Sequence, residues 1–195
     1  MSSPNPSPWG IEPANLLTEW SRLLLGSLAR IGVRDVIVSP GSRSTPFVWA
    51  ALQTPKLTCH SVLDERTAGF FALGLGRATG RPALLLCTSG TAAAHYLPAV
   101  IEAAESHIPL LILSADRPSE LRHAAAPQTI DQTRLFGEFT RGFFELGTPS
   151  PHESAFRSVS RFATQADERS RGALPGPVHL NAPSRKPLEP QTARN

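Results

Sequence analysis

Hydrophobic residues along the chain follow two spacings in turn, which predict alternating helices and strands. From Leu16 to Ile31 they recur every three or four residues and Gly32 follows, the pattern of an amphipathic helix with a stop signal. Short apolar runs such as Ala83–Cys87 predict buried strands. The other expected strands cover residues 36–39, 57–62, 110–114, 143–146 and 177–181, and the other expected helices cover residues 46–52, 64–79, 91–105, 131–139 and 151–169.

This order of elements predicts an α/β fold. Strands that are apolar throughout and separated by helices are typical of a parallel sheet covered on both faces. We therefore expect a doubly wound, mostly parallel sheet with helices on both faces, over residues 10–182. Residues 1–9 are rich in proline and serine and predict a disordered leader, whereas the proline-rich residues 183–195 predict a linker to downstream domains that the sequence lacks.

Composition narrows the function classes. A chain of 195 residues suits one domain, and its apolar runs are much shorter than the ~20 residues of a membrane helix. The N-terminus does not have the pattern of a secretory signal, so we expect a cytoplasmic protein without membrane contact. Cys59 and Cys87 are expected to be buried reduced thiols, and the six histidines have no metal-ligand spacing.

The charged residues indicate small anionic ligands. Seventeen of the 19 basic residues are arginine, which grips carboxylates and phosphates in a planar fork. They are scattered rather than clustered, which argues against a nucleic-acid stripe. A nucleic-acid binder, suggested by the pI of about 9.4, remains a rival whose affinity would fall steeply with salt.

The segment SPGSRST at residues 39–45 is the first candidate site, because ligands of parallel sheets bind beyond the carboxyl ends of the strands. Gly41 allows a tight turn, and Ser42 and Arg43 would offer a hydroxyl group and a guanidinium fork to an anion. The alternative is a plain turn in which Ser44 or Thr45 caps the helix that starts near Pro46. The two interpretations are compatible, and Arg43 favours a ligand, since a cap needs no arginine.

Charged residues follow two further strands. Glu65 falls in the first turn of an expected helix, where a carboxylate is stabilised without any function, so spacing alone favours that structural role over catalysis. Asp64 and Arg66 are expected to be solvated charges at the same helix start. Arg117 is a natural second anion fork, and Asp116 could simply pair with it.

Motifs of other enzyme classes are missing. The segment TSGT at residues 88–91 could cradle a phosphate but lacks the lysine of a P-loop, which disfavours nucleotide hydrolysis. The chain has neither the GxSxG of a nucleophilic serine nor the GxGxxG of a dinucleotide site.

Five motifs in order carry a resemblance to a known family. They are SPGSRSTP (39–46), DERTAGFFALGLGRATGRP (64–82), TSGTAAA (88–94), ADRP (115–118) and QTIDQ (128–132). Together they closely resemble the N-terminal segment of the 2-succinyl-5-enolpyruvyl-6-hydroxy-3-cyclohexene-1-carboxylate synthases (the MenD family), which are thiamine-diphosphate enzymes of menaquinone biosynthesis. The resemblance runs from about residue 15 to residue 183 and implies a pyrimidine-binding α/β domain.

The resemblance also implies site residues. Glu65 would hydrogen-bond the aminopyrimidine ring of thiamine diphosphate and promote formation of the ylide, with Pro40 as a second cofactor contact. Such a carboxyl group must be shielded from water, where desolvation raises its pKa. Ser42, Arg43, Arg117 and Gln128 match residues that line the isochorismate site, of which Gln128 comes from the resemblance alone. The other substrate would be 2-oxoglutarate, so both substrates would be small dicarboxylates.

The resemblance further implies parts that this chain does not hold. The family binds Mg²⁺ and the diphosphate through a GDG segment of a downstream domain, and no Gly-Asp-Gly occurs here. The cofactor would lie between subunits of a homodimer or homotetramer, so the chain alone should be inactive. Departures from the family pattern occur at His95, at Pro127 beside Gln128, and at residues 184–186. The alternatives are a stand-alone carboxylate-binding or regulatory module, and another thiamine enzyme such as a decarboxylase or acetolactate synthase.

Overall fold

The computed structural model describes residues 16–190, and the predicted leader at residues 1–9 lies outside them. Six strands form one parallel sheet in the order β2-β1-β3-β4-β6-β5, which confirms the predicted doubly wound α/β fold. The strands are β1 (Asp35–Val38), β2 (Thr58–Ser61), β3 (Ala83–Cys87), β4 (Leu110–Asp116), β5 (Gly142–Glu145) and β6 (Pro177–Pro183). The helices are α1 (Leu16–Arg30), α2 (Thr45–Leu52), α3 (Glu65–Thr79), α4 (Leu97–Glu105) and α5 (Glu153–Ser170).

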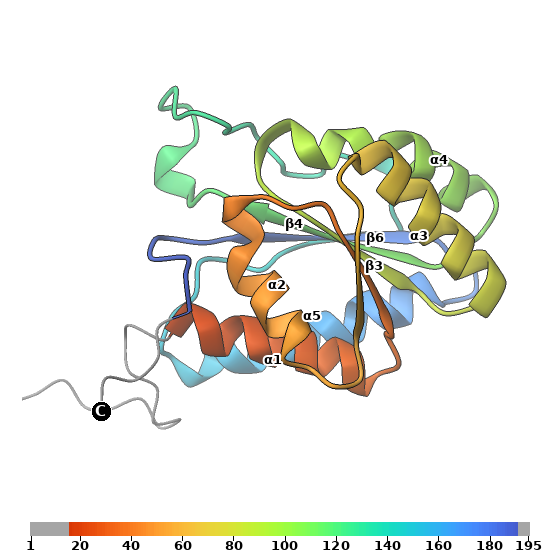
Figure 1. Cartoon of the computed structure of the whole chain (residues 1–195), viewed down its shortest axis with the longest axis horizontal. Coiled ribbons are helices and arrows are strands. Elements are labelled where there is room, and N and C mark those ends of the chain that lie inside the picture. Colours follow the sequence, from red (N-terminus) through yellow and green to blue (C-terminus); the bar gives the residue numbers. More distant parts are fainter. Residues whose placement is uncertain (1–15, 191–195) are drawn as a thin grey trace, which may run out of the picture.

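Helices cover both faces of the sheet, as Figure 1 shows, with α1, α2 and α5 on one side and α3 and α4 on the other. The first layer is filled by large side chains, among them Trp20 and Phe156, whose rings meet edge to face at 5.5 Å. In the second layer, α3 and α4 approach each other closely through small residues: a Cβ atom at Gly69 of α3 would lie 2.9 Å from the Cβ of Ala99 of α4. Each large apolar side chain buried in these layers contributes about 1.5–3 kcal/mol.

Two expected helices differ from the structure. Residues 131–139 form turns and a short 3₁₀ helix at Gly137–Phe139, because Arg134 and Gly137 have positive φ angles (51° and 56°) that end any α-helix. Residues 91–105 are not one helix: a 3₁₀ helix at Gly90–Tyr96 precedes α4, which has Pro98 in its first turn.

The segment after β6 returns to the domain. Pro183 is still part of β6, Ser184 and Leu188 are buried, and Arg185 pairs with Glu120 at 2.5 Å. The linker predicted from residue 183 therefore begins as packed chain, and residues 191–195 lie outside the described part. Among residues 16–190, no helix combines the length and apolar character that a membrane crossing requires.

Candidate functional site

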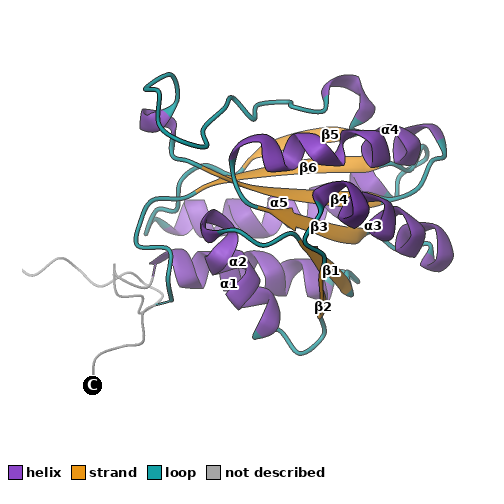
Figure 2. Cartoon of the chain, turned by 45° about the horizontal axis from the view of Figure 1, so that its top comes forward, coloured by secondary structure: helices purple, strands orange, loops and turns teal. Residues whose placement is uncertain are grey.

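The strand order leads us to expect a ligand-binding crevice between β1 and β3. From β1 the chain moves to β2 on one side and then returns to β3 on the other, which is the topological switch point where open α/β sheets bind ligands. The segments that follow β1, β3, β4 and β6 meet at this edge. In Figures 1 and 2 the long loop after β4 extends beyond the same end of the sheet.

The turn after β1 packs directly against the turn after β3. A Cβ atom at Gly41 would lie 2.4 Å from the Cβ of Thr88, so only glycine fits this contact. The hydroxyl group of Ser44 donates to the Gly41 carbonyl oxygen (2.8 Å) and makes no cap bond to α2, although Ser44 occupies the N-cap position. Pro40 and Ser42 are exposed at the rim of this turn. The turn is therefore shaped by close packing rather than by helix capping.

Arg43 is buried without a full set of partners. Its side chain is only 4% exposed, and its Nη1 donates to the carbonyl oxygen of Ser184 (2.8 Å), whereas its Nε is buried and unpartnered. Burial lowers the pKa of Arg43, the nearby charge of Arg117 lowers it further, and Asp116 opposes the effect. Buried donors are normally paired, so this guanidinium group is suited to an anionic ligand.

Arg117 lies close enough to Arg43 to perturb it electrostatically, which brings the two predicted anion forks together. The sequence left open whether Asp116 pairs with Arg117, and the structure shows a backbone contact rather than an ion pair between them. Asp116 accepts from the backbone N–H of Arg117 (2.7 Å) but forms its ion pair with Arg122 (2.9 Å). The Nε of Arg117 donates to the carbonyl oxygen of Pro127 (2.8 Å), and residues 16–190 provide no hydrogen-bond partner for its Nη atoms.

Gln128 also reaches this edge, with its side chain turned toward the loop after β3. Its Nε2 donates to the Ser89 carbonyl oxygen (3.0 Å), and the Ser89 hydroxyl group donates to the Gln128 carbonyl oxygen (3.1 Å). The residue is exposed and has a positive φ angle of 55°, which is uncommon outside glycine. The predicted substrate residue thus lies at the crevice, next to the departure from the family pattern at Pro127.

Glu65 is the first residue of α3, which follows edge strand β2. The helix start is capped by Asp64, which accepts from the backbone N–H groups of Arg66 (2.9 Å) and Thr67 (3.1 Å). The Arg66 guanidinium, followed by the Thr67 N–H, holds the pKa of Asp64 well below its usual range. Asp64 therefore has the structural role that spacing suggested for this helix start, and Glu65 is not needed for it.

The Glu65 carboxylate is half-buried and makes no hydrogen bond or ion pair with any residue between 16 and 190. Its charge adds to the pKa elevation of Tyr96, which arises first from burial, and acts in the same direction on Cys87. The Tyr96 hydroxyl group donates to Ser39 Oγ (3.0 Å) at the end of β1. Beneath Glu65 there is thus a buried polar cluster of Ser39, Cys87 and Tyr96, which sequence reasoning missed.

A second polar network, which the sequence did not predict, lies at the edge between β4, β6 and β5. Asn181 lies at its centre and bonds Asp116, Glu145 and Gln132, all at 2.8–3.0 Å. Gln132 in turn accepts from the backbone N–H of Gly90 (2.8 Å). The network therefore ties the loop after β4 to the turn after β3. The one signal in the sequence was the position of Asp116 and Asn181 near the ends of apolar strands.

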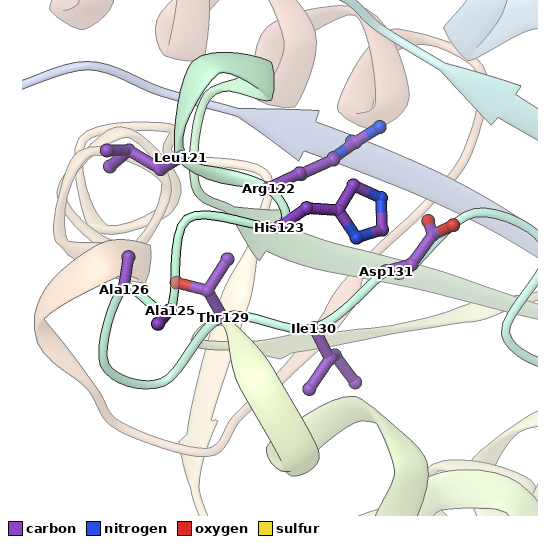
Figure 3. Close-up of a pocket in the computed structure, with 8 residues that line it drawn as sticks. All are labelled: Leu121, Arg122, His123, Ala125, Ala126, Thr129, Ile130 and Asp131. Atoms are coloured by element: carbon purple, nitrogen blue, oxygen red, sulfur yellow. The ribbon is translucent and has the colours of Figure 1, made fainter.

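The loop after β4 encloses a pocket of about 250 Å³ (Figure 3). Figure 3 shows the lining residues, with Arg122 directed away from the loop tip toward the strands; they are residues 121–123, 125, 126 and 129–131. Within residues 16–190, no group of three or more histidine, cysteine or acidic side chains could hold a metal ion. Both cysteines are free thiols; Cys87 is buried as expected, but Cys59 is only half-buried.

The sequence is similar to those of known proteins. The sequence matches the family described as "Thiamine pyrophosphate enzyme, N-terminal TPP binding domain" over residues 18–135, more than half of the chain. Similar proteins named 2-succinyl-5-enolpyruvyl-6-hydroxy-3-cyclohexene-1-carboxylate synthase include one from Sorangium cellulosum (56% identity over 92% of this chain and 29% of the relative) and one from Halorubrum lacusprofundi (52% over 90% and 28%). A third, from Microcystis aeruginosa, is 49% identical over 92% of this chain and 32% of its own length.

The chain therefore spans about a third of the length of the curated relatives it matches. The matched family covers α1 through β4 and most of the loop that follows, including the turns after β1 and β3 and the start of α3. The chain belongs to the thiamine pyrophosphate enzymes and carries their N-terminal TPP binding domain.

Proposed function

We propose that the chain is the pyrimidine-binding domain of a thiamine-diphosphate-dependent transferase. In the complete protein, this enzyme removes carbon dioxide from 2-oxoglutarate and adds the remaining carbanion to isochorismate, in menaquinone biosynthesis. The names of relatives at 49–56% identity support the reaction. The observation that carries the proposal is Glu65, an acidic side chain without a protein partner at the start of α3, beside the switch-point crevice.

The residues present fit an aminopyrimidine ring. Glu65 offers a half-buried carboxyl group with no competing hydrogen bond from residues 16–190, and Pro40 offers an exposed apolar contact at the end of β1. Bound thiamine diphosphate would supply the nucleophilic carbon that makes decarboxylation and carbon–carbon bond formation possible. The part of Glu65 is to hold a proton between its carboxyl group and a ring nitrogen. Closure of the site around the ring would exclude water and so strengthen the hydrogen bond in which that proton is shared.

The anion residues fit a dicarboxylate. Arg43 and Arg117 are near one another and both retain guanidinium N–H groups without protein partners among the described residues. Ser42 is exposed beside Arg43, and Gln128 lies at the neighbouring turn. We propose that these four residues bind isochorismate, with the arginines on its carboxylates.

The proposal places Mg²⁺ and the diphosphate on a part of the protein beyond this chain, because Gly-Asp-Gly does not occur in its sequence. The chain alone should then be inactive. A homodimer or homotetramer that completes the site from a second subunit is part of the proposal, supported by the exposed rings of Phe70 (48%) and Phe71 (43%) on the same helix as Glu65. We also propose a cytoplasmic location.

The test is Glu65→Gln in the complete protein, with Asp64→Asn as the matched control because asparagine preserves the helix cap. Loss of a general acid–base group should lower turnover about 10²–10⁴-fold. Deuterium exchange at the thiazolium carbon of the bound cofactor, followed by NMR after acid quench, should slow as well, while the melting temperature stays near the wild-type value. Normal turnover and exchange in Glu65→Gln would refute the role of Glu65. Synthase activity of the 195-residue chain alone would refute the assignment of the metal site.

A second candidate function is carboxylate binding without catalysis, and the unpartnered Nε of Arg43 favours it because that site lies wholly within this chain. Calorimetry of the chain with isochorismate or a downstream naphthoate separates the two. A binding module should take up one of them at micromolar concentration, whereas a fragment of the synthase should bind far more weakly.

A further inference from the structure

Arg122 forms an ion-pair bridge between two acidic side chains from different strands. Its Nη2 lies 2.9 Å from Asp116 Oδ2 at the end of β4 and 3.1 Å from Glu145 Oε1 at the end of β5. The Arg122 side chain is 19% exposed and Asp116 is fully buried. Figure 3 agrees, since the Arg122 side chain leaves the loop in the direction of the strands.

The partners of Asp116 are all accounted for. Oδ1 accepts from the backbone N–H of Arg117 (2.7 Å), and Oδ2 accepts from Arg122 and from Asn181 Nδ2 (2.9 Å each). A buried carboxylate needs a compensating positive charge. Two arginines are within reach in the sequence, at positions 117 and 122, and the structure uses the more distant one.

This choice leaves Arg117 available. Its guanidinium group makes one bond, from Nε to the Pro127 carbonyl oxygen, and its Nη atoms have no hydrogen-bond partner within residues 16–190. Arg43, which senses both Arg117 and Asp116 electrostatically, is likewise under-paired. The two guanidinium groups form an anion site only as long as Asp116 does not capture one of them.

We propose that Arg122 is a positioning residue: it pairs with Asp116 and Glu145 so that the neighbouring Arg117 stays free, with Arg43, to bind the anionic substrate. The inference rests on the proposed function, in which Arg43 and Arg117 bind a dicarboxylate. It adds a residue that need not touch substrate. The bridge carries one positive and two negative charges, so its net charge is −1.

If Arg122 acts through its charge, a second substitution should rescue the first; if it acts only through packing and hydrogen bonds, it should not. Arg122→Gln changes the net charge of the bridge to −2, adding repulsion toward an anion and freeing Asp116 to attract Arg117. Adding Glu145→Gln restores the charge to −1, although it removes a further ion-pair member. If Arg122 mattered only for packing and hydrogen bonds, the double variant would be at least as impaired as the single one.

The experiment measures kcat and the KM for isochorismate in the complete protein. We expect Arg122→Gln to raise KM about five- to tenfold with little change in kcat. This is the size of effect expected when one positive charge that is little screened by solvent is lost near the anion site. Arg122→Gln/Glu145→Gln should return KM to within about twofold of wild type, as expected when the net charge is restored. Arg134→Gln, a loop arginine with no ion pair in the described residues, should leave KM unchanged.

Arg122→Lys covers the case in which Arg122→Gln fails to fold, because lysine retains the charge without the fork. We expect its KM to stay near that of wild type. A double variant as impaired as Arg122→Gln, or a lysine variant as impaired as glutamine, would overturn the inference. If the wild-type protein has no synthase activity, the proposed function fails. An active wild type whose Arg122→Gln variant has a normal KM contradicts this inference alone.

Discussion

The two sides of the sheet's carboxyl edge differ in how fully their carboxylates are paired with other side chains. On the side formed by β4, β6 and β5, Asp116 and Asn181 each bond several partners, and Arg122 pairs with both Asp116 and Glu145, although its buried Nε has no partner among residues 16–190. On the side formed by β2, β1 and β3, Glu65 has no partner in the described chain and Arg43 keeps a buried Nε unpaired. The groups of the paired side are engaged with one another, whereas those of the unpaired side are available to a ligand.

Energetics explain why the difference is informative. An unpaired polar group taken out of water costs about 1–3 kcal/mol, and a charged one costs more. A folded chain tolerates this cost where it serves binding, so unpaired groups that cluster at a switch point indicate a site. Densely bonded networks at the same edge instead indicate the scaffold that holds the site in place. Substitutions on the paired side should therefore change stability, and substitutions on the unpaired side should change binding.

The largest effect should come from breaking the paired side at its centre. Asn181→Ala removes the side chain that bonds Asp116, Glu145, Gln132 and Ser114, leaving several buried groups unsatisfied. We expect the free energy of unfolding of this chain in urea to fall by about 3 kcal/mol. Gln128→Ala, an exposed amide at the crevice, should change it by less than about 0.5 kcal/mol. Equal losses in the two variants would contradict the distinction between scaffold and site.

A pH effect of intermediate size should come from His179, which is fully buried between Phe136 and Phe143 and bonds Ser114 Oγ (2.7 Å). Burial lowers the pKa of His179 to about 3. The folded protein therefore keeps this ring neutral at pH 5, while the unfolded chain, with the ordinary histidine pKa near 6.5, takes up a proton. Stability from this group is present above pH 6.5 and is lost as pH falls toward 3.

Between pH 7 and pH 5 this linkage should remove about 2 kcal/mol from the free energy of unfolding. His179→Gln keeps a donor for Ser114 Oγ, whose own proton goes to Asn181 Oδ1, but glutamine cannot titrate, so the loss of stability over the same interval should be smaller by that amount. The other titrating groups are common to both proteins and cancel in the difference. If urea unfolding showed that both proteins lose the same free energy of unfolding between pH 7 and pH 5, His179 would not be the titrating group.

The sequence was sufficient for the fold because the layers depend on local patterns. Runs such as Ala83–Cys87 are apolar throughout, and all five of these residues are buried in β3. The expected helix at residues 131–139 failed because Gln132, an acceptable helix residue by propensity, is drawn inward to bond Gly90 N across 42 positions of sequence. Non-local contacts of this kind overrode the local pattern.

The candidate site was only partly predictable for the same reason. Arg43 and Arg117 were found because each closely follows a strand, and parallel strands end at one edge. The ion-pair partner of Asp116 could not be predicted, since the choice of Arg122 over the adjacent Arg117 depends on how the loop folds back toward β5. Family resemblance named Glu65 but could not show that Asp64 caps α3 and that Glu65 has no structural bond.

Two arginines, the buried Arg43 and the half-buried Arg141, separate effects on stability from effects on binding. Arg43→Met replaces an under-paired buried charge with an apolar chain of similar length, so stability should change by less than about 1 kcal/mol. Loss of a charge-assisted hydrogen bond should raise the KM for isochorismate about tenfold or more in the complete protein.

Arg141→Met is the matched control at the opposite end of the sheet. Arg141 donates to the carbonyl oxygens of Ala104 (2.6 Å) and Leu174 (3.1 Å), so its removal should cost about 1–2 kcal/mol while KM stays unchanged. An Arg43 variant that loses stability but keeps its KM would return Arg43 to a structural role in the turn.

The smallest effect concerns backbone strain in the loop after β4, where His123, Ala125, Gln128 and Arg134 have positive φ angles. For Ala125 (φ 51°), the left-handed conformation costs about 1–2 kcal/mol, and glycine adopts it freely at the expense of more chain entropy. Ala125→Gly should therefore stabilise the chain by about 0.5 kcal/mol, whereas Ala124→Gly, at a position without a positive φ angle, should destabilise it slightly. Urea unfolding of the pair gives the difference directly. If both glycines destabilise equally, the loop is not strained at Ala125, and its conformation must be maintained by the polar network alone.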